Sequence, residues 1–77
     1  MNGLRLLRER RLMTQGDLAD KIGIRYQTVS EWENGHSRPR VAAMRKLCEV
    51  LGVTPDELIA ALNETREAAE GKMLAAA

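Results

Sequence analysis

Hydrogen-bonding side chains recur on one side of the segment spanning residues 25–34, and the other side of that segment is apolar. At helical spacing, the polar face is expected to carry five side chains: Tyr26, Gln27, Ser30, Glu31 and Asn34. Val29 and Trp32, three residues apart, fall on the opposite face. A glutamine amide can form two hydrogen bonds with adenine, and a glutamate can accept one from cytosine. The segment is therefore predicted to form a helix, roughly over residues 25–33, whose outer face has the chemistry to read DNA bases.

The residues before this helix are spaced to bring a second helix across it around a tight turn. Thr14 is expected to cap that earlier helix, with Asp17 in the position that a capping box reserves for an acid. Ala19 is small enough to let the two helices approach closely, and Gly23 can end the first one in a left-handed conformation. Two short helices that cross in this way form a helix-turn-helix, whose second helix lies in a DNA groove.

Three more helices are predicted around this pair. The first covers roughly residues 3–12, and the fourth covers residues 41–51 with an apolar stripe at helical spacing, namely Met44, Leu47, Cys48 and Leu51. The fifth begins at Thr54 and Pro55, a cap followed by the residue favoured at the first helical position. The chain shows no strand signal. The predicted fold is all-α, a compact five-helix bundle over residues 1–62, followed by an Ala/Glu-rich tail over residues 63–77 that is either helical or frayed.

Composition narrows the class of protein. A chain of 77 residues makes one small domain, and without Phe its core must be mostly aliphatic. No apolar run approaches the roughly 20 residues of a membrane span, and the N-terminus has no signal-peptide pattern. The single Cys excludes an internal disulfide, and with one His it offers too few ligands for a metal site. We therefore expect a soluble protein of the cytoplasm, associated with the nucleoid, without cofactor, metal, membrane contact or small-molecule ligand.

The net charge of +1 conceals an uneven distribution. Residues up to 40 carry eight Lys/Arg and five Asp/Glu, a net charge of +3. The remaining residues carry four Lys/Arg and six Asp/Glu, a net charge of −2. A basic half suits a molecule with one DNA-facing side, although small domains often show such an imbalance by chance.

The whole pattern resembles the Cro/lambda-repressor type of helix-turn-helix domain, the Xre family, over about residues 3–62. In size and layout the chain also resembles restriction-modification controller proteins and small phage repressors. The matching segments are Leu7-Arg8, Thr14-Gln15, Leu18-Ala19, Lys21-Ile22-Gly23-Ile24, Thr28-Val29-Ser30, Glu33-Asn34-Gly35, Arg38-Pro39 and Leu51-Gly52-Val53.

The resemblance implies roles for individual residues. The helix over residues 25–33 would lie in the major groove, with Gln27 the first choice for a base contact. Arg25 stands where the family usually has a Ser or Thr cap, and it would bring charge to the DNA backbone instead. Glu31 would repel phosphate, so it is expected to read a base or to pair with Arg25 or Arg38. The implied contacts are Gln15 with a phosphate, Tyr26, Gln27, Ser30 and Glu31 with base edges or nearby phosphates, and Asn34, His36 and Arg38 with the backbone on the other side.

The resemblance also implies a partly buried ion pair between Arg8 and Glu33, and it places Trp32 in the core.

These observations favour a sequence-specific regulator of transcription that binds double-stranded DNA. A domain this small reads few base pairs, so a homodimer on an inverted repeat is predicted. The expected interface is the last helix with the tail, because Leu58, Ile59 and Leu62 exceed what a small core can absorb. One alternative is an antitoxin-like module that binds a protein partner and regulates its own gene. A second alternative, an enzyme, is disfavoured because the chain has one His, one Cys and no acidic cluster around a Gly-rich loop.

Overall fold

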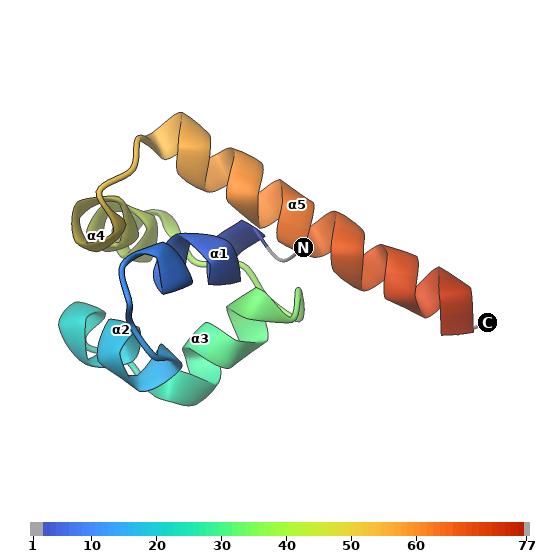
Figure 1. The fold of residues 1–77 in the computed structure, drawn as a ribbon, viewed down its shortest axis with the longest axis horizontal. Helices are drawn as coiled ribbons and strands as arrows, with labels where there is room; N and C mark the ends of the chain where they lie inside the picture. The colour runs from blue at the N-terminus through green and yellow to red at the C-terminus, as the bar shows by residue number, and fades with distance from the viewer. Residues whose placement is uncertain (1–2, 77) are drawn as a thin grey trace.

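The computed structural model describes residues 3–76, and the side chains of residues 3–70. The described chain forms five helices and no strand, which confirms the all-α prediction (Figure 1). The helices are α1 (Gly3–Arg10), α2 (Gln15–Ile22), α3 (Tyr26–Glu33), α4 (Val41–Leu51) and α5 (Pro55–Ala76). Figure 1 shows α1 to α4 gathered beside the first half of α5, whose C-terminal end projects away from them. Because α5 runs unbroken past residue 62, the boundary between a domain and a tail stays a prediction.

The start of α2 is fixed by the capping box that the sequence predicts. The Asp17 backbone N–H donates to the Thr14 hydroxyl at 3.0 Å, and the Thr14 backbone N–H donates to the Asp17 carboxylate at 2.9 Å. Hydrogen bonding of the Asp17 carboxylate to the Thr14 backbone, and secondly to the Thr14 side chain, lowers the pKa of Asp17. At the other end, Gly23 has φ 75° and ends the helix in the left-handed region, as predicted. Both ends of α2 are therefore determined by local chemistry.

The end of α1 differs from the prediction. The helix ends at Arg10 rather than near Leu12, because Leu12 itself adopts a left-handed conformation with φ 56°. The Leu12 N–H donates to the Glu9 carbonyl at 2.9 Å, and the Met13 N–H donates to the Arg8 carbonyl at 3.4 Å. This pair of bonds is the Schellman arrangement that usually places Gly at the left-handed position. A leucine there is strained, and its side chain is 93% exposed.

The core lies where α2 and α3 cross and where α1, α4 and α5 cover them. Ala19 of α2 and Val29 of α3 are fully shielded, and Trp32 is only 5% exposed, so Trp32 belongs to the core as predicted. The small Ala19 side chain allows the close crossing on which the helix-turn-helix depends. The other buried aliphatic residues come from α1, α2, α4 and α5: Leu4, Leu18, Ile22, Leu47, Leu51, Leu58, Ala61 and Leu62.

The predicted dimer surface on α5 needs correction. Leu58 is 0% exposed and Leu62 is 3% exposed, because both point into the domain's own core. Only Ile59 of the three remains accessible, at 41%. The expectation that these leucines exceed the capacity of the core is therefore wrong, since α1 and α4 bury them within one chain.

Of the helices in the described part of the chain, none combines the length and the apolar character that crossing a bilayer requires.

Candidate nucleic-acid interface

The outer face of α3 is exposed along its length. Val29, Trp32 and Glu33 are buried, which turns the opposite side of the helix to solvent. Tyr26 is 56% exposed, and Ser30 is half-buried near the middle of the face. The exposed polar side chains here are Arg25, Gln27, Glu31 and Asn34. The structure thus brings the polar residues singled out in this segment onto one accessible surface, which we call the α3 face.

The first turn of α3 is held without a side-chain cap. Arg25 occupies the capping position with φ −81° and ψ 148°, and its side chain makes no cap hydrogen bond. This agrees with the expectation that an arginine cannot serve there as Ser or Thr would. The Thr28 N–H donates instead to the Arg25 carbonyl at 3.1 Å, and the Arg25 side chain stays exposed. The positive charge of Arg25 is therefore available beside the N-terminus of the helix.

Glu31 keeps an exposed carboxylate on the α3 face. Within residues 3–70, no salt bridge joins Glu31 to Arg25 or to Arg38. Of the two explanations offered by the sequence, pairing with an arginine is therefore not seen in the free protein. The other explanation, that Glu31 accepts a hydrogen bond from a base, stays a prediction.

Gln15, at the start of α2, belongs to a hydrogen-bonded network under the α3 face. Its amide donates to the Glu33 carboxylate at 3.2 Å. Glu33 in turn pairs with Arg8 at 2.6 Å and 3.1 Å, and Arg8 also donates to the Met13 carbonyl at 2.8 Å. The hydrogen bond to Glu33 raises the pKa of Arg8, although burial opposes the shift. The ion pair implied by the family resemblance is thus confirmed, and it also restrains Gln15.

Asn34 lies at the C-terminal end of the α3 face. Its side-chain amide donates to the Ser30 carbonyl at 2.9 Å and to the Ser30 hydroxyl at 3.3 Å. The Asn34 side chain therefore hydrogen-bonds to the last turn of α3. The predicted contact of Asn34 with the DNA backbone would have to form in addition to these bonds or replace them.

The loop after α3 carries the other two expected backbone contacts, His36 and Arg38, and both are exposed. Arg38 donates through Nη1 to the Asn63 Oδ1 of α5 at 3.1 Å. Sequence reasoning missed Asn63, because residues 25 positions apart meet here only through the packing of α5 against this loop.

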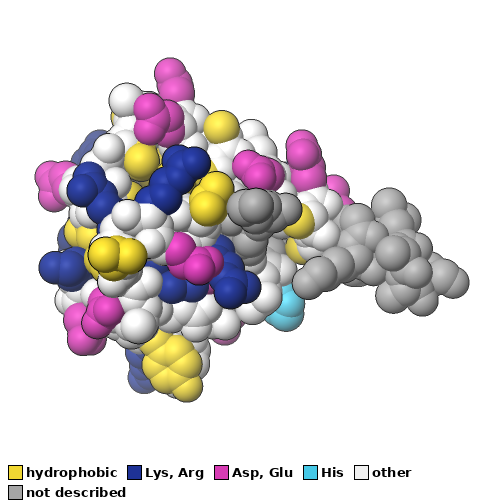
Figure 2. Space-filling model, viewed as in Figure 1, with side chains coloured by type: hydrophobic (Ala, Val, Ile, Leu, Met, Phe, Trp, Pro, Cys, Tyr) yellow, Lys and Arg dark blue, Asp and Glu magenta, His cyan; other side chains and the backbone are white. Residues whose placement is uncertain are grey.

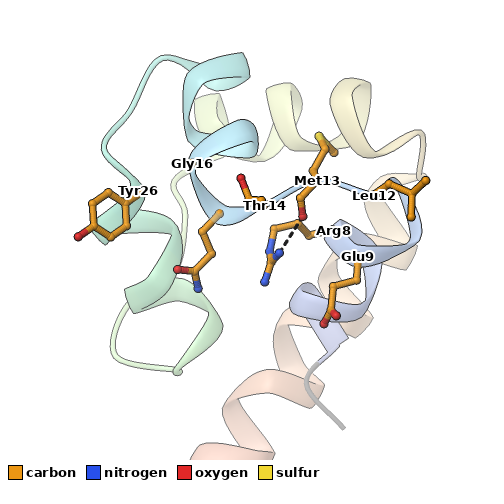
Figure 3. A pocket seen from close by; sticks show the side chains of 8 residues that line it. Arg8, Glu9, Leu12, Met13, Thr14, Gly16 and Tyr26 are labelled. Carbon is orange, nitrogen blue, oxygen red and sulfur yellow. Dashed lines mark hydrogen bonds between the residues drawn. The ribbon is translucent and has the colours of Figure 1, made fainter.

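An open hollow lies between the α1–α2 turn and the start of α3. Figure 3 shows Tyr26 on one side of it, Leu12 on the other, and the Arg8–Met13 hydrogen bond between them. The lining residues are Arg8, Glu9, Leu12, Met13, Thr14, Gln15, Gly16 and Tyr26. The hollow therefore borders two expected DNA contacts, Gln15 and Tyr26, and it also contains the exposed Leu12, which the sequence had placed in a helix.

Charge is not evenly spread over the surface. On the side seen in Figure 2, acidic side chains lie along α5, while most of the basic side chains lie over the other helices. This agrees with the net charges of the two halves of the sequence, because α1 to α3 come from the basic half.

Comparison with known proteins identifies the family. The family profile described as Helix-turn-helix matches residues 4–58, which include the whole of α1 to α4 apart from Gly3. The "Antitoxin HipB" of Escherichia coli O6:H1 is 35% identical over 69 residues, covering 90% of this chain and 72% of that protein. The chain therefore belongs to the helix-turn-helix family, and the resemblance to its Xre type is confirmed.

Two further relatives are longer than this chain. The "Uncharacterized HTH-type transcriptional regulator RghRB" of Bacillus subtilis is 41% identical over 76 residues, covering 88% of this chain and 55% of the relative. "Multiprotein-bridging factor 1c" of Arabidopsis thaliana is 49% identical over 41 residues, covering 53% of this chain and 28% of the relative. The chain thus spans little more than half of the former and about a quarter of the latter. No solved structure gives a significant match. At the level of the family, a helix-turn-helix domain, the kind of domain whose second helix can enter a DNA groove, is confirmed.

Proposed function

We propose that this protein binds double-stranded DNA sequence-specifically, with α3 in the major groove, and thereby regulates transcription. Gln27 is the principal base contact, and Tyr26, Ser30 and Glu31 meet base edges or nearby phosphates. Contacts with the DNA backbone come from the start of α2, from the two ends of the α3 face and from the following loop: Gln15, Arg25, Asn34, His36 and Arg38.

One observation carries this proposal, namely the division of α3 into a buried side and a polar exposed side. Val29, Trp32 and Glu33 anchor the helix, so its backbone is fixed relative to α2. Gln27 and Glu31 are exposed and lie four residues apart, one turn of the same side. A rigid helix that presents exposed amide and carboxylate groups is suited to base recognition in a groove that admits a helix.

We further propose that two copies bind an inverted repeat. A single α3 contacts few base pairs, and a symmetric dimer of this motif would place its two half-sites about 34 Å apart, one turn of DNA. The burial of Leu58 and Leu62 moves the proposed interface away from those side chains. Ile59, which is 41% exposed, is the one of the three that a partner copy could cover.

Selection of bound fragments from a pool of random duplexes tests these points together. We expect an enriched motif with two-fold symmetry and half-site centres about 10 base pairs apart. A motif without symmetry would remove the dimer but keep base recognition. Enrichment of no motif, with binding that depends only on salt, would contradict sequence-specific recognition.

An antitoxin-like role is a second candidate, because one relative, of which this chain covers 72%, is named an antitoxin. In that case the main partner would be a protein, and DNA binding would serve to regulate the chain's own gene. The discriminating measurement is DNA affinity with and without the product of a neighbouring gene. An increase in affinity that depends on that product favours the second candidate, and an unchanged affinity favours the first.

A further inference from the structure

The middle of α5 is attached firmly to the N-terminus of α1. The Leu4 N–H donates to the Thr65 hydroxyl at 3.2 Å, and that hydroxyl donates to the Ala61 carbonyl at 3.0 Å. Thr65 is 2% exposed. At Gly3 the two helices approach so closely that an added Cβ would lie 2.6 Å from the Ala61 carbonyl oxygen. This part of α5 therefore has a fixed position in the domain.

The same stretch of α5 lies against the loop that follows α3. An added Cβ at Gly35 would lie 2.7 Å from the Cβ of Ala69 and 3.5 Å from the Thr65 carbonyl oxygen. Gly35 also has φ 75°, so it combines a left-handed backbone with this close approach. Figure 1 shows the loop after α3 turning back towards α5 at this place. The route of the loop is thus set by α5 as well as by α3.

Arg38, in the loop after α3, connects α5 to the proposed DNA-binding surface. Its Nη1 donates to the Asn63 Oδ1 at 3.1 Å, and both side chains are exposed. A guanidinium has five N–H donors, so one bond to Asn63 leaves donors for a phosphate. An amide oxygen can hold the guanidinium without adding the negative charge that would compete with phosphate.

We propose that Asn63 is a positioning residue that orients Arg38 towards the DNA backbone. This inference rests on the proposed function, in which Arg38 meets a phosphate. A long side chain such as arginine loses conformational entropy when DNA binding fixes it in one rotamer. If a hydrogen bond already holds the side chain before binding, that loss is smaller, and for a partly exposed arginine we expect the affinity to be about two- to fivefold higher. Through Asn63, α5 would contribute to DNA affinity without itself touching DNA.

A double-mutant cycle on the full chain tests the inference. The variants are Asn63→Ala, Arg38→Ala and both together, and the probe is a random-sequence duplex at several salt concentrations. Asn63→Ala is expected to weaken binding about two- to fivefold and to leave the salt slope near that of the wild type. Arg38→Ala is expected to reduce the salt slope by about one. In the double variant, Asn63→Ala should cause no further loss of affinity beyond that caused by Arg38→Ala. Because Ala favours helix more than Asn does, loss of folding is not expected at position 63.

The outcomes separate the two claims. If Arg38→Ala weakens binding but Asn63→Ala does not, Asn63 has no positioning role and the proposed contact of Arg38 stands. If Asn63→Ala weakens binding equally with and without Arg38, its effect does not pass through Arg38 and the inference is overturned. If Arg38→Ala changes neither affinity nor salt slope, the proposed phosphate contact fails, and the inference fails with it.

Discussion

Arg8 and Glu33 form a buried ion pair that joins the first helix to the end of the third, with 2.6 Å between Nε and Oε2. The carboxylate also accepts from Gln15 at 3.2 Å, so the pair connects α1, α2 and α3 at one point. The proposed DNA-contacting elements therefore share one charged anchor. Removing one partner of a buried pair leaves the other charge desolvated, which costs far more than the pair itself contributes.

We expect Glu33→Ala to lower the free energy of unfolding by about 3–5 kcal/mol, because it leaves the Arg8 guanidinium buried without its carboxylate. Glu9→Ala is the matched control, since it removes the exposed Arg5–Glu9 pair at 2.7 Å. That loss should be about 1 kcal/mol or less. Urea unfolding of the two variants checks this, and equal losses would show that the buried pair has no special weight.

Leu12 gives a prediction of increased stability. The residue has φ 56° and is 93% exposed, so the fold pays for left-handed strain without burying the side chain. Leu12→Gly should raise the free energy of unfolding by about 1 kcal/mol, after the greater freedom of glycine in the unfolded chain is subtracted. Leu12→Ala keeps the strained backbone and should change little. A glycine variant no more stable than the alanine variant in thermal unfolding would refute the conformation assigned to Leu12.

Asp17 makes stability depend on pH. Its bonds with Thr14 lower its pKa in the folded state relative to the unfolded state. The ionised carboxylate therefore contributes stability above the unfolded pKa, and that contribution is lost as the pH falls through the folded pKa, from about pH 4 downwards. The melting temperature of Asp17→Asn should fall less than that of the wild type over this window. Identical acid profiles would mean that the capping box has no electrostatic part.

Leu62 distinguishes a core residue from a dimer contact. Because Leu62 is 3% exposed, Leu62→Ala should cost about 2–5 kcal/mol of unfolding free energy at every protein concentration. Ile59→Ala, at a position 41% exposed, should cost about 1 kcal/mol or less. Sedimentation that showed a folded monomer for Leu62→Ala, with wild-type stability, would restore Leu62 to an interface and contradict the packing described above.

The parts of the fold that sequence could predict are those decided by neighbours along the chain. The Thr14–Asp17 capping box, the left-handed Gly23 and the inward Trp32 follow from local chemistry and helical spacing, and the structure has them as predicted. The burial of Leu58 and Leu62 on α5 could not be predicted, because it depends on α1 and α4 packing against α5, which spacing alone does not reveal. The same reason explains why Asn63 was missed.

The α3 face shows the same division between local and long-range determinants. Its polar side could be read from the phase of Val29 and Trp32, because both residues lie on one helix. The hydrogen bond between Gln15 and Glu33 could not be predicted from the sequence, because it joins α2 to the end of α3. Tertiary packing thus decides which polar groups near the α3 face are restrained by hydrogen bonds within the protein.

The most direct test of base reading by α3 is the affinity of Gln27→Ala for the selected DNA site and for a random duplex, measured at one salt concentration. Gln27 is an exposed polar residue outside the hydrophobic core, so the fold should be unaffected. We predict a loss of about 1–3 kcal/mol on the selected site, relaxed base preference at one position and little change on random DNA. An equal loss of affinity on both duplexes would indicate that Gln27 contacts the DNA backbone and not a base. No loss on either duplex would contradict the proposal that α3 lies in the major groove.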